Sequence, residues 1–252
     1  MMNTNLHTLP QNPQTQAAQS KCREQALTNL NTDLRLPASA VTEELCWMLS
    51  PEPSVTRKLL ECAHKKEKSG EHVSRTTSVV RYAAGAVFPE HTHSGGEEFL
   101  VLDGTLSDES GDYPKGWYVR NPPGATHAPF SKDGAKIFVK LGQMHIFDRK
   151  VVRIDTSCAN ANWQTVACGT KTLSLFESPH EHVALVHWPA GLKLKPMRFA
   201  GGLEIYVLEG RFVDEFGDHR PGAWLRIPAG HGHQPRAVED SLLYVKTGHL
   251  KI

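Results

Sequence analysis

The sequence lacks both an excess of charge of one sign and any long apolar run. It has 28 lysines and arginines against 27 acidic residues, for a formal net charge of +1. Such a balance provides no basic surface for a nucleic acid or an anionic membrane. No apolar segment approaches the roughly 18 residues that a membrane-spanning helix needs. The polar N-terminal segment contains no hydrophobic signal. We therefore expect no nucleic-acid partner and no membrane association.

Cysteine is also scarce, and no CxxC pair occurs. The chain has five cysteines, an odd number, and they are widely separated: Cys22, Cys46, Cys62, Cys158 and Cys168. Scattered cysteines without a metal-binding spacing are typical of reduced thiols. We expect a cytoplasmic protein in which these side chains pack as small hydrophobic residues.

The most informative feature that is present is a set of three histidines and one glutamate. His91 and His93 are two residues apart, so on a strand both point to one face. The glycines at 95–96 allow a tight turn, after which Glu97 begins a returning strand with the same parity. His127 follows a Pro-Pro-Gly segment that bends the chain inward. We expect these four side chains to converge.

Such a set of side chains predicts a mononuclear metal site. Neutral imidazoles suit Zn, Fe, Ni and Cu, and an added carboxylate extends the choice to Mn. An isolated His-x-His is more often a surface or hydrogen-bonded pair. Here it is followed at suitable distances by Glu97, Gly104, Gly116, Pro122, Gly124 and His127, and this spacing favours the metal site.

The same frame recurs 106 residues later without the site. Met197, Phe199 and Leu203 stand at the positions of His91, His93 and Glu97, and we expect them to fill the second pocket and keep it dry. His233 alone cannot hold a metal tightly. A new site built from His187, His231 and His233 is a weak alternative, because no acidic ligand is suitably placed. Both halves keep several residues: Gly85/Gly191, Glu98/Glu204, Asp108/Asp214, Arg120/Arg226, Pro122/Pro228 and His127/His233.

Residues that both halves share are expected to serve the fold. Glu98 and Glu204 have the parity that points away from the pocket, with Arg120 and Arg226 as candidate partners. Further upstream the offset becomes 116, which pairs Glu61 with Glu177. The difference falls around residues 63–74, where we expect a longer hairpin loop in the first half.

The strand pattern predicts an all-β protein. Short apolar runs are broken by Gly, Pro and Asp at regular intervals, as in jelly-roll barrels. We expect a flexible tail over residues 1–32 with a short helix at 21–31, one barrel over 33–147 and another over 148–252, packed tightly together. Residues 151–155 should start the second barrel. The expected strands include residues 79–81, 99–102, 117–120, 136–141, 184–188, 205–208, 223–227 and 242–247.

Residues 85–104 and 116–127 resemble the two motifs of the cupin superfamily. The stretch HTHSGGEEFLVLDG from His91, together with NPPGATH ending at His127, is most similar to the cupin domain of ChrR-type anti-sigma factors. The resemblance implies two tandem antiparallel jelly-roll barrels in one chain, a bicupin. It also implies that His91, His93, Glu97 and His127 are the metal ligands, in the first barrel only.

The resemblance implies two functions. The first is a regulatory or sensing role with one bound divalent metal, most readily zinc. Sigma-factor binding is not expected, because residues 1–33 offer only His7 and Cys22 in place of a zinc-binding domain. The alternative is a metal-dependent dioxygenase with Fe, Mn or Ni, acting on a small oxygenated molecule held in the first barrel. A third possibility is a binding module without chemistry that carries a small ligand in the first barrel. A homodimer is expected in each case. Candidate pocket residues are Phe88, Phe99, Val101, Tyr118 and Phe130.

Overall fold

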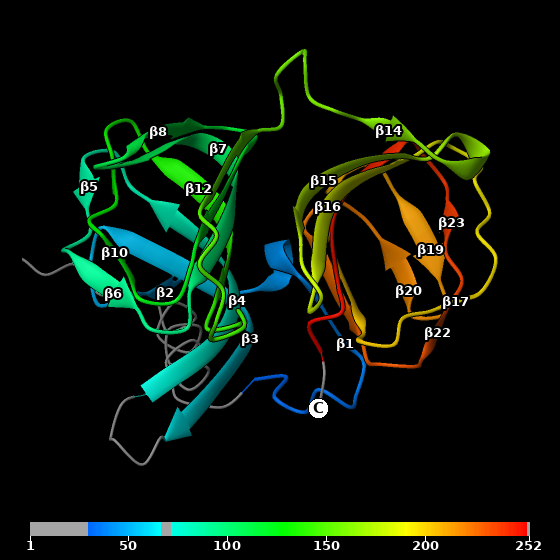
Figure 1. Ribbon diagram of the computed structural model, residues 1–252, viewed down its shortest axis with the longest axis horizontal. Coiled ribbons are helices and arrows are strands. Elements are labelled where there is room, and N and C mark those ends of the chain that lie inside the picture. The colour runs from blue at the N-terminus through cyan, green and yellow to red at the C-terminus, as the bar shows by residue number, and fades with distance from the viewer. Residues whose placement is uncertain (1–29, 67–71, 251–252) are drawn as a thin grey trace, which may run out of the picture.

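The computed structural model describes residues 30–66 and 72–250, and within these ranges strands dominate and no α-helix occurs (Figure 1). No helix in these ranges is long and apolar enough to cross a lipid bilayer. The elements up to residue 155 are β1 (Ala38–Val41), the 3-10 turn η1 (Thr42–Glu44), β2 (Met48–Leu49), β3 (Val55–Lys66), β4 (His72–Tyr82), β5 (Ala86–Val87), β6 (His91–His93), β7 (Glu97–Asp108), β8 (Gly111–Pro114), β9 (Trp117–Asn121), β10 (Ala125–His127), β11 (Phe130–Ser131), β12 (Ala135–Leu141) and β13 (Val152–Asp155). Those that follow are β14 (Gln164–Thr165), the 3-10 turn η2 (Ala167–Gly169), β15 (Lys171–Glu177), β16 (His182–Trp188), β17 (Met197–Arg198), β18 (Leu203–Glu209), β19 (Phe212–Asp214), β20 (Gly217–His219), β21 (Ala223–Ile227), β22 (Gly232–His233), β23 (Arg236–Ala237) and β24 (Ser241–Thr247).

The strands form two barrels that lie side by side in Figure 1. The first barrel is built on the strand order β13-β9-β7-β12-β4-β3-β2, with β6 and β10 paired across its opening. The second has the order β1-β21-β18-β24-β16-β15-β14, with β17 and β22 in the position of β6 and β10. The pairings are antiparallel, and every strand run expected above falls inside one of these strands. The prediction of two tandem antiparallel jelly rolls is confirmed.

Each half completes the sheet of the other. β1 precedes the first barrel in sequence but pairs with β21 of the second, from Ala38↔Arg226 to Val41↔Ala223. In the same way β13 pairs with β9 of the first barrel, from Val152↔Arg120 to Asp155↔Trp117. The expectation that residues 151–155 begin the second barrel is therefore wrong. The segment is a strand, but it covers the exposed hydrogen-bonding edge of β9, and apolar alternation does not reveal which edge a strand will cover.

The hairpin β3–β4 is longer than its counterpart β15–β16, but residues 63–66 and 72–74 of the charged stretch, which we expected to form a loop, belong to its strands. β3 and β4 have 12 and 11 residues, whereas β15 and β16 have 7 each. The register also corrects one repeat pairing. Glu61 lies opposite Thr77, and Phe176 lies opposite Val183, so Phe176 rather than Glu177 is the counterpart of Glu61. Bulges in both β3 and β15 shift the register in a way that the sequence offset cannot show.

The predicted tail lies mainly outside the described residues. The expected helix at 21–31 does so as well, apart from its last two residues. Leu30 forms an antiparallel bridge to Cys62 on β3, with N–O distances of 2.8 and 2.9 Å. Ordered contact with the first barrel therefore begins before residue 33.

Three large apolar clusters and a smaller one around Met48, Leu59 and Cys62 hold the described part of the molecule together. One fills each barrel, and the third lies between the two sheets and joins them. In this third cluster the ring of Phe138 stacks on Tyr206 of the other barrel, with centroids 4.4 Å apart, and meets Tyr244 edge-on. The tight packing of the barrels that the absence of a Gly/Ser linker predicted is thus observed.

Buried charges cross the same interface. Glu98 accepts hydrogen bonds from Tyr118 and Arg120 at 2.7 and 2.9 Å, and it pairs with Lys246 of the second barrel. Glu98 therefore points away from the pocket, as its parity predicted, with Arg120 as its partner. Arg226 differs, because its ion pair is made with Glu61 and not with Glu204.

Candidate metal centre

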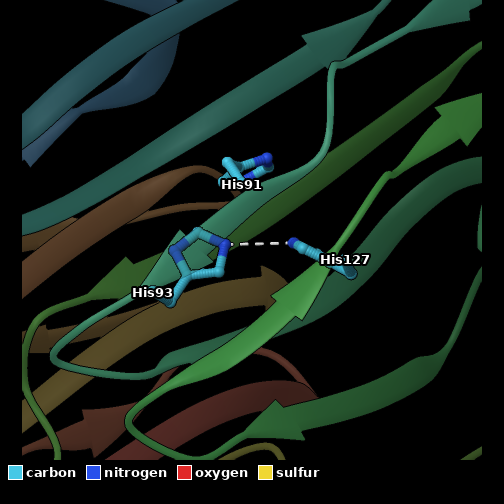
Figure 2. A group of neighbouring side chains, drawn as sticks. All are labelled: His91, His93 and His127. Atoms are coloured by element: carbon cyan, nitrogen blue, oxygen red, sulfur yellow. Dashed lines mark hydrogen bonds between the residues drawn. The ribbon is translucent and has the colours of Figure 1, made fainter.

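Strand pairing brings the predicted histidines together. His91 and His93 lie on β6, and His127 lies on the antiparallel β10, where it is directly opposite His91 (Figure 2). The turn between β6 and β7 depends on Gly96, which has φ of +75° and donates its N–H to the carbonyl of His93. A β-carbon at this glycine would lie 2.4 Å from the sulfur of Met144. The turn delivers Glu97 to the start of β7, behind the histidines.

The three imidazoles form a compact cluster. His91, His93 and His127 each offer a nitrogen, and these nitrogens lie within 4.8 Å of one another. His93 Nε2 and His127 Nε2 are 3.0 Å apart and face each other in Figure 2. Glu97 places Oε1 3.5 Å from His93 Nε2 and Oε2 3.4 Å from His127 Nε2. The structure thus brings Glu97 beside two of the histidines.

The outer side of each ring indicates how the cluster fits a cation. His91 Nδ1 lies 2.8 Å from the carbonyl oxygen of Pro89 and donates to it, which leaves the Nε2 lone pair free. His127 Nδ1 lies 3.5 Å from Oδ2 of the buried Asp108, so its other nitrogen faces His93. Carbonyl and carboxylate groups behind histidine rings are the usual partners of metal-ligating imidazoles. The donor set and its orientation therefore fit a divalent metal.

Burial and charge act differently on the two inner histidines. Burial lowers the pKa of His93, and the neighbouring His91 and His127 add to this effect against the opposing charge of Glu97. Burial also disfavours the charged form of His127, but the nearby carboxylates of Asp108 and Glu97 outweigh it and raise the pKa of His127. His93 is thus kept in the neutral form that can coordinate a cation.

A second layer of polar side chains, centred on Arg153 of β13, lies behind this set. Asn121 donates to Glu97 Oε2 at 3.2 Å, and Arg153 donates to Asn121 Oδ1 at 2.6 Å. Arg153 also donates to the hydroxyl of Tyr113 at 3.0 Å, and Tyr113 donates to Asp108 at 2.9 Å. One arginine therefore supports both Glu97 and the carboxylate behind His127.

Sequence reasoning missed this support. At the offset of 106, Ile227 replaces Asn121, and by strand register Ser39 replaces Arg153. Comparison of the two halves at the offset of 106 could have identified Asn121, because it is lost together with the candidate ligands. The same comparison could not identify Arg153, because the strand that carries it was assigned to the wrong barrel.

A small pocket of about 110 Å³ opens beside the cluster. Phe88, predicted to line it, does so together with His91, His93 and Glu97. Phe99 and Val101 do not line it, because they belong to the core of the same barrel. Two further predicted pocket residues are wrong as well: Tyr118 lies in the interface between the barrels, and Phe130 is 39% exposed. Tyr118 has the parity of Glu98, and Phe130, at the start of the two-residue strand β11, is directed to solvent, so neither side chain faces the pocket.

An arginine that the sequence did not single out also lines this pocket. Arg57 lies on β3, and its Nε is buried without a hydrogen-bond partner in the described part of the chain. No ion pair to Arg57 is found there either. A guanidinium without a carboxylate partner, next to a cation site, is suited to hold an anionic group of a small molecule.

The second barrel does not reproduce the cluster. Met197 pairs with His233 as His91 pairs with His127, so the predicted correspondence of Met197 to His91 is confirmed. The expectation that Met197, Phe199 and Leu203 fill the pocket is wrong, because all three line a cavity of about 400 Å³. Their side chains form its wall without reaching across it.

The alternative site in the second barrel also fails. His233 is bound by Asp214, with Nε2 3.0 Å from Oδ2. His231 is exposed, and His187 lies between Val186 and Trp188, which face the cavity, so its side chain points away. Within residues 30–66 and 72–250, the group with metal-binding geometry is His91, His93 and His127.

Comparison with known families agrees with this geometry. The profile described as the ChrR cupin-like domain matches residues 37–145 and again residues 151–251. The chain belongs to the ChrR cupin-like family. Each match begins at a strand that completes the opposite barrel, so the exchanged strands are part of the repeated unit. No curated protein matches the sequence.

Solved structures share the fold at low identity. A proposed dioxygenase from Nostoc punctiforme is 14% identical with a TM-score of 0.68, over 86% of this chain and 85% of that one. The Escherichia coli pirin YhhW in complex with nickel(II) is 14% identical with a TM-score of 0.60, over 84% and 98%. A mutant of the Bacillus subtilis oxalate decarboxylase OxdC is 13% identical with a TM-score of 0.57, over 84% and 76%. At these identities the likeness extends to the fold.

Proposed function

We propose that this cupin holds one divalent metal in its first barrel through His91, His93, Glu97 and His127, and that it has a regulatory or sensing role. The observation that carries the proposal is the convergence of the three imidazole nitrogens within 4.8 Å. The carboxylate of Glu97 adds one negative charge beside them, and its two nearest histidines are largely buried. A buried set of this kind is stabilised by a cation and destabilised without one.

Zinc is the metal that we propose for the regulatory role. Three imidazoles and one carboxylate can complete a four-coordinate zinc site, which is typical of structural centres. The support from Asn121 and Arg153 fixes Glu97 in one orientation, as a closed site requires. Such a metal would tie β6, β7 and β10 together and make the stability of the barrel respond to metal supply.

A second candidate function is a metal-dependent dioxygenase. Arg57 and the pocket of about 110 Å³ beside the ligands favour it, because a metal with open positions would have room for a small oxygenated molecule. The fold likeness to the proposed dioxygenase from Nostoc punctiforme is in keeping with this alternative. In this case Fe, Mn or Ni would supply the Lewis-acid or redox chemistry, and Arg57 would orient an anionic group of the substrate.

Metal analysis of the purified, untagged protein tests both candidates. The regulatory proposal expects one zinc per chain and a lower melting temperature after chelation. The enzymatic candidate expects Fe, Mn or Ni with solvent in the coordination sphere, seen by X-ray absorption. We expect the double variant His91→Ala, His93→Ala to lose the metal, and His233→Ala, the matched control in the second barrel, to retain it. Unchanged metal in the double variant would end the proposal.

We also propose a small ligand in the first barrel, a homodimer and a cytoplasmic location. Light scattering of the intact chain measures the dimer directly.

A further inference from the structure

The cavity of the second barrel occupies the position that the metal pocket occupies in the first. At the offset of 106, its residues Met197, Phe199 and Leu203 correspond to His91, His93 and Glu97. Further along the wall, Ala184 and Val186 correspond to Ser78 and Val80, which line the metal pocket. The second cavity is nevertheless larger, at about 400 Å³ against about 110 Å³. Its volume falls in the range of small-molecule sites in proteins, roughly 300 to 1,000 Å³.

The wall of this cavity is mainly apolar and carries no lysine, arginine, aspartate or glutamate. Phe199 and Met197 are half-buried at its edge, and Val166 beside them is 48% exposed. Apolar side chains thus reach solvent at the opening. The remaining wall residues are Thr170, Thr172, His182, Ala184, Val186, Trp188, Leu194, Leu203, Ile205, His233, Val245 and Thr247. A charged ligand would find no partner of opposite charge in this wall.

Two buried polar atoms on this wall lack hydrogen-bond partners among the described residues. They are Nδ1 of His233, which is 1% exposed, and Oγ1 of Thr170, which is 7% exposed. Buried polar groups are normally hydrogen-bonded, and an unpaired group is costly. Asp214 accepts from Nε2 of His233 at 3.0 Å and does not line the cavity. With its hydrogen on Nε2, the neutral ring presents Nδ1 as an acceptor, and the threonine hydroxyl can donate or accept.

We infer that the second barrel binds a small uncharged organic molecule, largely apolar, whose hydroxyl group donates to His233 Nδ1. The apolar wall buries the body of the ligand, and the two unpaired polar atoms orient its hydroxyl. The site is independent of the metal, because His233 alone is kept at the positions where the first barrel has three histidines and a glutamate. The duplicated chain therefore carries two pockets of different chemistry at the same position of the same fold.

Calorimetric titration of the full chain with phenol tests the inference, with anisole and benzoate as comparisons. Phenol should bind saturably at one site per chain. Anisole has the same ring but no donor and should bind about threefold to tenfold more weakly, as expected for the loss of one hydrogen bond. Benzoate is charged and should not bind. The variant His233→Phe should abolish the preference for phenol over anisole. Absence of saturable phenol binding would overturn the inference.

Filling variants locate the bound phenol. Ala184→Phe and Val186→Phe should each abolish binding, whereas Ser78→Phe, the matched change in the first barrel, should leave it unchanged. Binding that persists in both filling variants, or that is lost in Ser78→Phe, would contradict the assignment. Melting curves establish that each variant is folded. If neither filling variant folds, a phenol-soaked crystal of the unaltered chain decides, because phenol beside His233 supports the inference and phenol elsewhere overturns it.

Discussion

Lys140 of the first barrel donates to both carboxylate oxygens of Glu204 in the second barrel, at 2.6 and 2.7 Å. Both side chains are almost fully buried. Lys246 and Glu98, at the equivalent positions, form the reciprocal pair across the same interface. The two buried ion pairs are therefore related by the internal repeat, and each joins the barrels.

Removal of one partner of such an ion pair should lower the stability of the folded protein. We expect Lys140→Met to lower the free energy of unfolding by about 3 to 5 kcal/mol, because Glu204 would be left buried without its counter-charge. Urea titration measures this loss. Arg211→Met, which breaks the exposed pair with Asp218, is the control and should cost no more than about 1 kcal/mol. A loss of that small size for Lys140→Met would show that water reaches Glu204.

The support for the metal ligands from β13 gives a second prediction. Replacing Arg153 by serine, the residue at the matched position of the second barrel, removes the donors to Asn121 and Tyr113. We expect the metal affinity to fall about tenfold, the lower end of the range for outer residues of metal sites. Competition with a chromophoric chelator measures it. Arg149→Ser, an exposed arginine of the same connecting segment, should leave the affinity unchanged.

His249 predicts how stability depends on acidity. Burial lowers the pKa of His249 to about 3, against the opposing effect of its hydrogen bond to Glu204. The unfolded chain has the ordinary pKa of 6.5 and therefore takes up the proton first. The contribution of this neutral ring to stability is thus complete above pH 6.5 and is lost as the pH falls toward 3. The nearby charged groups are Glu204, Lys140 and Lys246.

The matched residue of the first barrel is Gln143, so His249→Gln is the natural test. We expect it to remove a slope of about 1.4 kcal/mol per pH unit below the pKa of the free side chain. Urea unfolding between pH 6.5 and 5 in the His91→Ala, His93→Ala background excludes effects of metal release. An unchanged slope would mean that His249 becomes protonated in the folded state.

The ligand set should be transferable to the second barrel. We expect the triple variant Met197→His, Phe199→His, Leu203→Glu to bind a second metal, because His233 already stands opposite residue 197. The site should be about 10-fold to 100-fold weaker than the first, because Ile227 and Ser39 cannot support the new glutamate. Titration in the His91→Ala, His93→Ala background isolates it. Failure to bind would show that Asp214 holds His233 too firmly to turn.

The sequence predicted the fold and the histidine cluster because both depend on short-range pattern. Alternation along a strand places His91 and His93 on one face, and the internal repeat reveals where the ligands are lost. Arg153 was missed because its contact depends on which sheet edge β13 covers. The cavity beside Phe199 was missed because the volume of the side chains on one wall does not reveal the distance to the opposite wall of the barrel. The sequence therefore predicted the apolar replacements correctly, but the conclusion that they fill the pocket of the second barrel was wrong.

The exchange of β1 and β13 has a consequence for dissecting the molecule. Residues 38–41 are attached to the N-terminal half but hydrogen-bond to the C-terminal one. Deleting them would remove a strand from the second barrel, although the first barrel is the one that follows them in the sequence. If the two halves were produced separately, each would carry a strand that completes the barrel of the other. Each barrel would then be complete only after the two halves associate. The single chain is thus organised like a strand-exchanged dimer.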